Sequence, residues 1–297
     1  MNNARSDKVL VISPVRNEAA YIQQTVDSMI AQTHRPAVWL VVDDGSSDDT
    51  PGIIERAAAE HDWIRLYRRA DRGVRKVGGG VVDAFYEGLD QFNMDDYDFV
   101  CKLDGDLRFR PRYFEGLLEK FDANPRLGTA SGKSFLEIDG RLVPERTGDL
   151  FSQGQTKLYR VECFKQIGGF VREVMWDGID CHRCRMFGWE ARSFHDEELR
   201  FIHLRVMGSS FKSVYHGRLR WGYGQYFMGT HPLYALAIMG YRTLERPWIL
   251  GGVMILCGYL GGYLKRKPRY DDPAFRRFLR RWQLSRLRLA RPPSPVA

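Results

Sequence analysis

The stretch from Phe99 to Asp106 reads FVCKLDGD, and it decides the fold that we expect for this chain. An apolar run that ends in two carboxylates one residue apart is typical of a buried strand that delivers acidic side chains at its carboxyl end. In open α/β sheets, ligands bind at that edge. Carboxylates on a tight glycine turn suit Mg²⁺ or Mn²⁺, and such an ion can hold a diphosphate. A polar turn after a strand is the structural alternative, so the motif depends on its context.

Length and composition set the first limits. With 297 residues, of which 44% are hydrophobic and 28% charged, the chain can bury one large core or form one domain with an appendage. Much of its formal charge of +8 comes from Lys265 onward, and such a basic tail favours an anionic partner. Five scattered cysteines are typical of reduced cytosolic thiols. The first apolar run, Val9 to Ile12, is too short for a signal peptide.

Strands and helices alternate through the first third of the chain. Apolar, β-branched runs predict three strands before Phe99, over Lys8–Ser13, Val38–Val42 and Ile64–Tyr67. The residues between them have helical spacing, over 19–31, up to about 60 and up to 89. This alternation predicts βαβ units, and therefore an α/β fold with a mostly parallel, Rossmann-like sheet.

The pattern changes after Asp106. We expect a helix over Pro111–Phe121, a strand over Leu127–Ile138 with a turn after it, and a helix over Asp177–Phe187. From Gly222 to about residue 290 the pattern predicts helices alone. We therefore divide the chain into an α/β domain, residues 1–220, and a helical, basic extension, residues 221–297.

Four motifs stand in one order along this expected fold: PVRNE at residues 14–18, VDDGS at 42–46, DGD at 104–106 and WDGID at 176–180. Together they resemble the inverting family 2 glycosyltransferases, which have the A-type, nucleotide-sugar-binding fold. The resemblance covers roughly residues 8–220, and four motifs in register are more specific than any one. It implies an enzyme that moves a sugar from a nucleoside diphosphate, with UDP favoured, to a polysaccharide or lipid-linked acceptor.

The resemblance implies a nucleoside pocket after the first two strands. Its first segment is residues 14–18, that is Pro14, Val15, Arg16, Asn17 and Glu18. Asp43 and Asp44 would accept hydrogen bonds from a uracil or similar base. Helix capping is the alternative for these acids, although the neighbouring serines could cap without them, and Glu18 could serve only its own helix N-terminus.

Basic residues at two places are candidates for contacts with the diphosphate. Arg75 and Lys76 precede a glycine run in which Gly79 would allow close backbone approach. A solvated loop charge is the alternative. Lys157 and Arg160 precede a short predicted helix, a place where relatives position the acceptor or the diphosphate.

A divalent cation, Mg²⁺ or Mn²⁺, is the implied cofactor. By resemblance, Asp106 is the direct metal ligand, and Asp104 contacts the ribose or a water on the metal. Asp104 and Gly105 also count among the nucleotide-binding residues. His203 ends a predicted strand and is a candidate third ligand, although a lone histidine near an apolar strand is often structural. The ion would neutralise the leaving diphosphate.

The general base requires a carboxylate near the acceptor hydroxyl. Asp177 matches the catalytic aspartate of the family, but Trp176 stands where the family has a glutamate. Asp180, one helical turn further on, is the reserve candidate. Either carboxylate could instead only stabilise the start of its helix.

The C-terminal region favours a membrane surface. Trp248–Leu264 is a run of 17 uncharged residues, short for a span, with aromatic residues at its ends and cations beyond. Arg276–Arg288 reads as a basic amphipathic helix. We expect peripheral or monotopic attachment to the cytoplasmic face of the membrane. A helical subdomain that packs on the catalytic domain is the alternative, and no motif favours nucleic acid.

Two other functions stay open from the sequence. A polyprenyl-phosphate glycosyl synthase would use the same donor site and a phosphate acceptor. A non-catalytic binding module could keep the fold, but the intact Asp104, Asp106 and Asp177 disfavour that reading.

Overall fold

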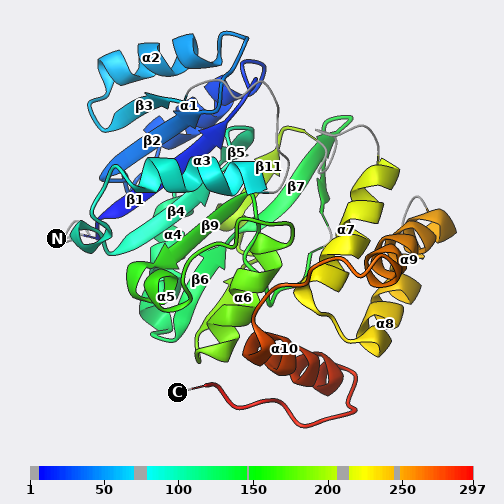
Figure 1. Cartoon of the computed structure of the whole chain (residues 1–297). Coiled ribbons are helices and arrows are strands. Elements are labelled where there is room, and N and C mark those ends of the chain that lie inside the picture. The colour runs from blue at the N-terminus through cyan, green and yellow to red at the C-terminus, as the bar shows by residue number, and fades with distance from the viewer. Residues whose placement is uncertain (1–6, 70–78, 146, 206–213, 244–247, 297) are drawn as a thin grey trace. The chain divides into compact units, whose positions relative to one another are not determined.

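The computed structural model describes residues 7–69, 79–145, 147–205, 214–243 and 248–296 (Figure 1). Arg75 and Lys76, predicted to contact a diphosphate, lie outside the described residues.

The chain forms two compact units. The first unit comprises Met1–Arg172 and Gly188–Val206, and the second comprises Glu173–Phe187 and Met207–Ala297. The division therefore differs from the expected boundary after residue 220. The reason is that the helix at 176–186 packs against the C-terminal helix. This contact places it in the second unit, although in the sequence it falls between two segments of the first.

A seven-stranded sheet is the centre of the first unit (Figure 1). Its order is β10-β6-β9-β4-β1-β2-β3, and every neighbouring pair is parallel except the two that involve β9. The sheet is therefore mixed, with four of its six pairings parallel as the alternating pattern predicts. The strand bounds are β1 Val9–Val15, β2 Val38–Asp43, β3 Ile64–Arg68, β4 Phe99–Leu103, β6 Leu127–Ser131, β9 Thr156–Arg160 and β10 Glu190–Ser193.

Helices cover both faces of this sheet. One face packs against α1 Ile22–Ile30, α2 Thr50–Glu60 and α4 Tyr113–Ala123 in a single buried apolar cluster. On the other face lies α3 Gly79–Leu89, where the Cβ position of Gly88 faces the side chains of Ile12, Leu40 and Val42. The short α5 Val161–Gln166 joins it through an edge-on contact of Phe164 with Phe85. Central strands buried on both faces need continuous apolar runs, which is why their sequences do not alternate.

A second sheet of four strands, in the order β5-β11-β7-β8, completes this unit. The expected strand over Leu127–Ile138 is in fact two strands, because the chain leaves the first sheet at Gly132 and enters the second. The short β5 directly after Asp106 was not predicted. The bounds are β5 Leu107–Phe109, β7 Lys133–Ile138, β8 Arg141–Pro144 and β11 Arg200–His203, with 3₁₀ turns at Met94–Asp96 (η1) and Glu197–Leu199 (η2).

The second unit contains helices and no strand among its described residues, as the sequence predicts. The helices are α6 Trp176–Met186, α7 Val214–Met228, α8 Pro232–Arg242, α9 Trp248–Leu264 and α10 Pro273–Arg286. Glycines allow α7 and α9 to approach very closely. A Cβ on Gly222 would lie 2.0 Å from the Ile255 carbonyl oxygen, and one on Gly258 would lie 2.0 Å from that of Leu219.

The apolar side of α10 packs inside this unit. Phe275, Phe278 and Leu279 are buried, and the ring of Trp282 meets that of His182 edge-on at 4.7 Å. These apolar side chains of α10 are thus covered within the unit, and the membrane attachment predicted for the C-terminal region stays a prediction. Of the helices that the structure describes, none is both long and apolar enough to cross a bilayer.

Gly132→Ala should destabilise the first unit. The added Cβ would lie 1.5 Å from the Leu199 carbonyl oxygen, so the backbone must shift where the chain changes sheets. We expect a loss of about 1–3 kcal/mol in the free energy of unfolding, measured by urea titration. Gly148→Ala is the control, since its nearest heavy atom would be 3.8 Å away, at Phe151. Equal stability of the two variants would contradict the packing described at Gly132.

Candidate nucleotide and metal site

Three of the predicted segments meet at one edge of the main sheet. Because β1, β2 and β4 are parallel neighbours, their carboxyl ends lie side by side. Residues 14–18, 43–44 and 104–106 follow those ends, and Val15 pairs directly with Asp43. The structure therefore brings together the nucleoside and metal candidates of the first unit at the edge where α/β sheets bind ligands.

The Asp-Gly-Asp turn is held from α1. The hydroxyl of Thr25 donates to the Gly105 carbonyl oxygen at 2.9 Å and accepts from the Leu107 backbone N–H at 3.0 Å. A Cβ on Gly105 would lie 2.7 Å from side-chain atoms of both Ile22 and Val15. Glycine is required here because the turn sits directly on the core, and this close packing fixes the direction of the two flanking aspartates.

Asp106 is the centre of the site. Its side chain is 3% exposed, and its carboxylate lies 2.9 Å from Arg205 Nε and 3.5 Å from His203 Nε2. Burial opposes the negative charge, but the contacts with His203 and Arg205 hold the pKa of Asp106 below its usual value. Asp106 is therefore an ionised carboxylate at neutral pH.

Arg205 joins Asp106 to the first loop. Its guanidinium donates to Glu18 Oε1 at 2.7 Å and lies 5.7 Å from the centre of the Tyr21 ring. The same Arg205 nitrogen is 2.7 Å from Asp106 Oδ2. The positively charged Arg205 guanidinium thus lies between the carboxylates of Asp106 and Glu18. Its role could not be predicted from the sequence, because nothing local distinguishes it from other arginines.

His203 lies between two carboxylates. Its Nε2 faces Asp106, and its Nδ1 is 3.4 Å from Glu145 Oε2. Burial opposes a charge on the imidazole, but hydrogen bonding and charge contacts with Asp106 and Glu145 raise the pKa of His203 to about 9. Without a metal, His203 is therefore protonated at neutral pH.

The donor chemistry at Asp106 fits a divalent cation. A carboxylate and an imidazole converge, and a second carboxylate, Glu145, stands behind the imidazole as in the usual support of a metal-bound histidine. Within the described ranges, no three His, Cys, Asp or Glu residues form a complete ligand set. Such an ion would keep positions for water and phosphate oxygens, as Mg²⁺ usually does.

Asp104 differs from Asp106 in its partner. It forms an ion pair with the buried Lys102 of the preceding strand, and the Lys102 ammonium also donates to the Gly154 carbonyl oxygen at 2.8 Å. A lysine inside an apolar strand is the signal that sequence reasoning passed over. Because Lys102 holds Asp104, the structure favours Asp106 and His203 as the pair that faces a metal.

The first two loops are tied to each other. Asn17 has a positive φ of 54°, and its side-chain oxygen accepts from the Ser47 backbone N–H at 2.8 Å. The Glu18 backbone N–H donates to the Thr50 hydroxyl at 2.8 Å, and Arg16 donates to the Asp44 carbonyl oxygen at 2.8 Å. These bonds give the predicted nucleoside pocket a fixed wall.

Asp43 and Asp44 both have partners in the protein. Asp43 accepts from the Ser46 backbone N–H at 3.1 Å, which is turn chemistry. Asp44 pairs at 2.5 Å with Arg69, whose buried guanidinium also contacts Glu87 at 2.6 Å. Arg69 follows β3 and was missed by the sequence analysis, although its position after a predicted strand matches that of the other site residues.

The other described candidates for contacts with the diphosphate or the acceptor are Gly79, Lys157 and Arg160. Gly79 is the buried first residue of α3, and Lys157 is fully buried in β9 opposite Lys102. Arg160 pairs with Phe99 at the amino end of β4, and its guanidinium donates to the carbonyl oxygens of Leu127 and Phe121. The assignment of Arg160 to the diphosphate or acceptor is therefore wrong, because it lies at the opposite end of the strand from Asp104.

Asp177 and Asp180 belong to the second unit. Asp177 is exposed in the first turn of α6, which begins after Met175 in a left-handed conformation. Asp180 is 1% exposed, and its carboxylate accepts from the Cys181 backbone N–H. Burial leaves Asp180 out of reach of an acceptor hydroxyl, so Asp177 is the better candidate for a base.

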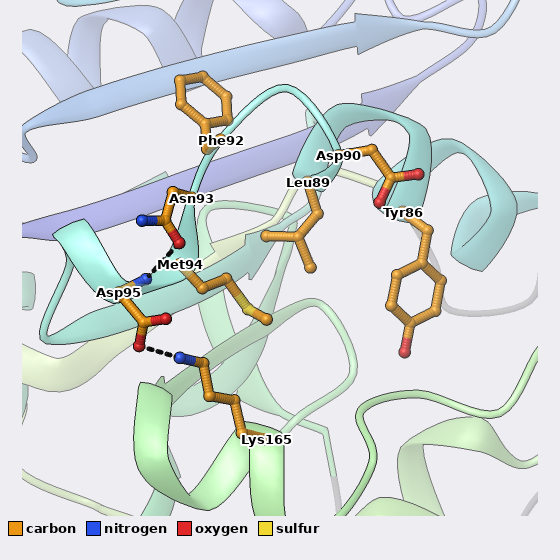
Figure 2. Close-up of a pocket in the computed structure, with 8 residues that line it drawn as sticks. All are labelled: Tyr86, Leu89, Asp90, Phe92, Asn93, Met94, Asp95 and Lys165. Atoms are coloured by element: carbon orange, nitrogen blue, oxygen red, sulfur yellow. Dashed lines mark hydrogen bonds and ion pairs between the residues drawn. The ribbon is translucent and has the colours of Figure 1, made fainter.

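A separate pocket of the first unit has no part in this site. It has a volume of about 420 Å³ and lies near the amino end of β4, between the end of α3 and α5 (Figure 2). Its Lys165 and Asp95 form an ion pair with each other, and Asn93 accepts from the Asp95 backbone N–H at 3.2 Å. None of the predicted site residues lines it.

Comparison with solved structures shows the same fold. A mannosyltransferase, PcManGT from Pyrobaculum calidifontis, solved with GDP-Man and Mn²⁺, matches 88% of this chain and 78% of its own with a TM-score of 0.54 and 19% identity. Residues 1–349 of S. aureus TarS, solved with UDP-GlcNAc, match 87% of this chain and 73% of their own with a TM-score of 0.53 and 16% identity.

Comparison of sequences finds curated relatives. Glycosyltransferase AglD of Haloferax volcanii is 31% identical over 192 residues, 63% of this chain and 27% of AglD. A poly-beta-1,6-N-acetyl-D-glucosamine synthase of Staphylococcus epidermidis is 29% identical over 116 residues, 39% of this chain and 26% of the synthase. The matches thus span about a quarter of these relatives. The model of glycosyl transferase family 2 matches residues 10–171, more than half of the chain. The chain therefore belongs to glycosyl transferase family 2.

Proposed function

We propose that this protein transfers a sugar from a nucleoside diphosphate to a hydroxyl acceptor, with inversion at the anomeric carbon and with a divalent cation at Asp106. One observation carries the proposal. Asp106 and His203 converge at the carboxyl edge of the sheet, and Glu145 stands behind the imidazole. This arrangement supplies one carboxylate and one nitrogen donor beside the loops that would hold a nucleoside.

Asp106 and His203 would hold the ion. When bound, it supplies positive charge to the diphosphate leaving group, which is the Lewis-acid role. Asp104, held by Lys102, would contact the ribose or a coordinated water. The closed turn at Gly105 keeps both carboxylates in fixed directions, so that little reorganisation is needed during the reaction.

The nucleoside would lie against the tied loops of residues 14–18 and 43–48. Asp43 and Asp44 each keep acceptor capacity beyond their present bonds, because a carboxylate has about four lone-pair sites. A base edge with N–H donors, such as uracil, fits acceptors of this kind. The solved structures of similar fold hold GDP-Man in one case and UDP-GlcNAc in another, which supports a nucleotide sugar as the donor class.

Asp177 is our candidate for the general base. Its exposed carboxylate would take the proton of the acceptor hydroxyl as the oxygen attacks the anomeric carbon. The bond between that carbon and the diphosphate oxygen breaks in the same displacement, which inverts the configuration. The nucleoside diphosphate leaves with the electron pair.

The acceptor class is a polysaccharide or a lipid-linked glycan. Similarity to a part of a poly-beta-1,6-N-acetyl-D-glucosamine synthase supports the polysaccharide. Transfer to a polyprenyl phosphate is the second candidate, favoured by the exposed apolar helices of the second unit. The two differ in chemistry, because a phosphate acceptor is already ionised at neutral pH and has no need of a base.

Asp106→Asn should weaken metal-dependent nucleotide binding. We expect the wild type to bind one of UDP, GDP and dTDP in the presence of Mn²⁺, and the variant to bind it at least tenfold more weakly, because a charged ligand is lost. Isothermal titration calorimetry measures this. Asp95→Asn, the same change near the amino end of β4, is the control and should bind like the wild type. Absence of nucleotide binding by folded wild-type protein would contradict the proposal.

Arg205→Gln should strengthen the binding of Mn²⁺ alone. Arg205 competes for the Asp106 carboxylate, so its removal leaves two buried carboxylates to attract the ion. We expect an increase of roughly tenfold in affinity, measured by the electron paramagnetic resonance signal of free Mn²⁺. Arg108→Gln, which removes an arginine from an exposed pair with Glu137, is the control. Weaker Mn²⁺ binding in Arg205→Gln would show that the two cations do not compete.

Asp177→Asn should reduce transfer to a hydroxyl acceptor by roughly 10²- to 10⁴-fold while nucleotide binding stays unchanged. The assay is release of the nucleoside diphosphate from its sugar donor. Transfer to a lipid phosphate, tested in parallel, should not depend on Asp177 because that acceptor carries no proton to remove. Asp180→Asn is the comparison, and its main effect should be on stability because the side chain is buried. Full transfer to hydroxyl acceptors by Asp177→Asn would rule it out as the base.

A further inference from the structure

In helix α9, the buried residues are mainly small and the exposed residues mainly large and apolar, the reverse of an ordinary surface helix. Its buried positions include four glycines, at 251, 252, 258 and 262, beside Ile255 and Tyr259, while most of its exposed positions carry large apolar side chains. The exposed ones are Trp248, Ile249, Leu250, Val253, Leu260, Tyr263 and Leu264, with exposed fractions from 43% to 78%. In a water-soluble helix the large apolar residues face the core. Small residues on the packing side and large apolar residues outside are typical of helices surrounded by lipid.

Helix α8 extends the same surface. Leu233, Leu236 and Tyr241 are about half exposed, and they follow helical spacing. Ala235 and Met239 on the other side are buried in one cluster with Ile255 and Tyr259 of α9. The exposed residues of the two helices form what we call the α8–α9 apolar face. Large apolar side chains exposed on two packed helices indicate an interaction site.

Basic residues stand at both ends of this face. Arg242 ends α8, where its guanidinium lies over the rings of Trp221 and Tyr241. Lys265, Arg266 and Lys267 follow α9 directly and are exposed. An apolar surface with cations at its borders complements a bilayer with anionic headgroups, since juxtamembrane Lys and Arg are attracted to them.

A small pocket lies at the basic end of α9. Arg266 and Arg269 line it together with Tyr226 and Tyr263, and its volume is about 390 Å³. Arg269 lies 4.7 Å from the centre of the Tyr226 ring. Two guanidinium groups that line one pocket suit a phosphate, and here the neighbouring apolar surface indicates the phosphate of a lipid headgroup.

We infer that the second unit binds the surface of an anionic lipid bilayer through the α8–α9 apolar face, with α9 lying in the interface and not across it. Its 17 residues are about 25 Å long, short of the roughly 30 Å of hydrocarbon that a span requires. The inference rests on the second unit alone and holds whether or not the proposed sugar transfer does.

Flotation of the full chain with lipid vesicles tests the face. We expect binding to phosphatidylcholine vesicles that contain 30% phosphatidylglycerol, and roughly tenfold weaker binding for Leu250→Glu with Leu260→Glu. Leu142→Glu adds a charge at an equally exposed leucine of the first unit and should bind like the wild type. Replacing Lys265, Arg266 and Lys267 by glutamine should weaken vesicle binding roughly fivefold for each charge removed. It should also reduce the dependence of binding on phosphatidylglycerol.

A probe on Cys257 gives the second readout. This cysteine is exposed on α9 between Val253 and Leu260, while the other four are buried. The emission of an environment-sensitive fluorophore on Cys257 should shift to the blue when anionic vesicles are added. The emission of the same fluorophore attached through Leu142→Cys, in a Cys257→Ser background, should not shift. Failure to bind vesicles would overturn the inference. So would a blue shift that depends on protein concentration without lipid, because it would assign the face to a second copy of the chain.

Discussion

The ion pairs of Arg205 with Asp106 and Glu18 hold the site together. They join the end of β11 to the turn after β4 and to the loop after β1, across 99 and 187 residues of sequence. Two largely buried carboxylates near one another would repel and would be costly to desolvate without a cation between them. Breaking such a buried pair typically costs 3–5 kcal/mol. Arg205 therefore stabilises a cluster of acids in the absence of a metal, and it keeps in place the groups that an incoming cation would use.

Much of the first unit could be predicted from sequence because its central strands are buried on both faces. Runs such as Phe99–Cys101 and Val38–Val42 are apolar throughout, and the helices between the strands set the parallel order. Pattern alone did not reveal the break at Gly132, since the residues on both sides of it are extended. That break depends on the distant Leu199 carbonyl oxygen, which occupies the space of a side chain. Contacts between residues far apart in sequence leave no local signal.

The same distinction applies to the site. Asp104, Asp106 and the loop at 14–18 could be located because each follows a strand, and the parallel sheet then brings them together. Glu145 and Arg205 could not, because they reach the site from the second sheet, whose pairing the sequence does not specify. Arg160 was misplaced for a related reason. Arg160 is the last residue of β9, which is antiparallel to β4, so Arg160 lies beside the amino end of β4.

The C-terminal helices show how composition and exposure can point to different surfaces. The charge pattern of α10 suggested a membrane helix, but its apolar side supports the packing of its own unit. The run of α9 carried a weaker amphipathic signal, because glycines and large apolar residues both count as uncharged. Only the distribution of side-chain size around the helix separates its packed side from its exposed side. Close backbone contact at Gly222 and Gly258 requires the small residues to face α7, and it leaves the large ones facing outward. An apolar exterior is thus a direct consequence of how tightly α7 and α9 pack.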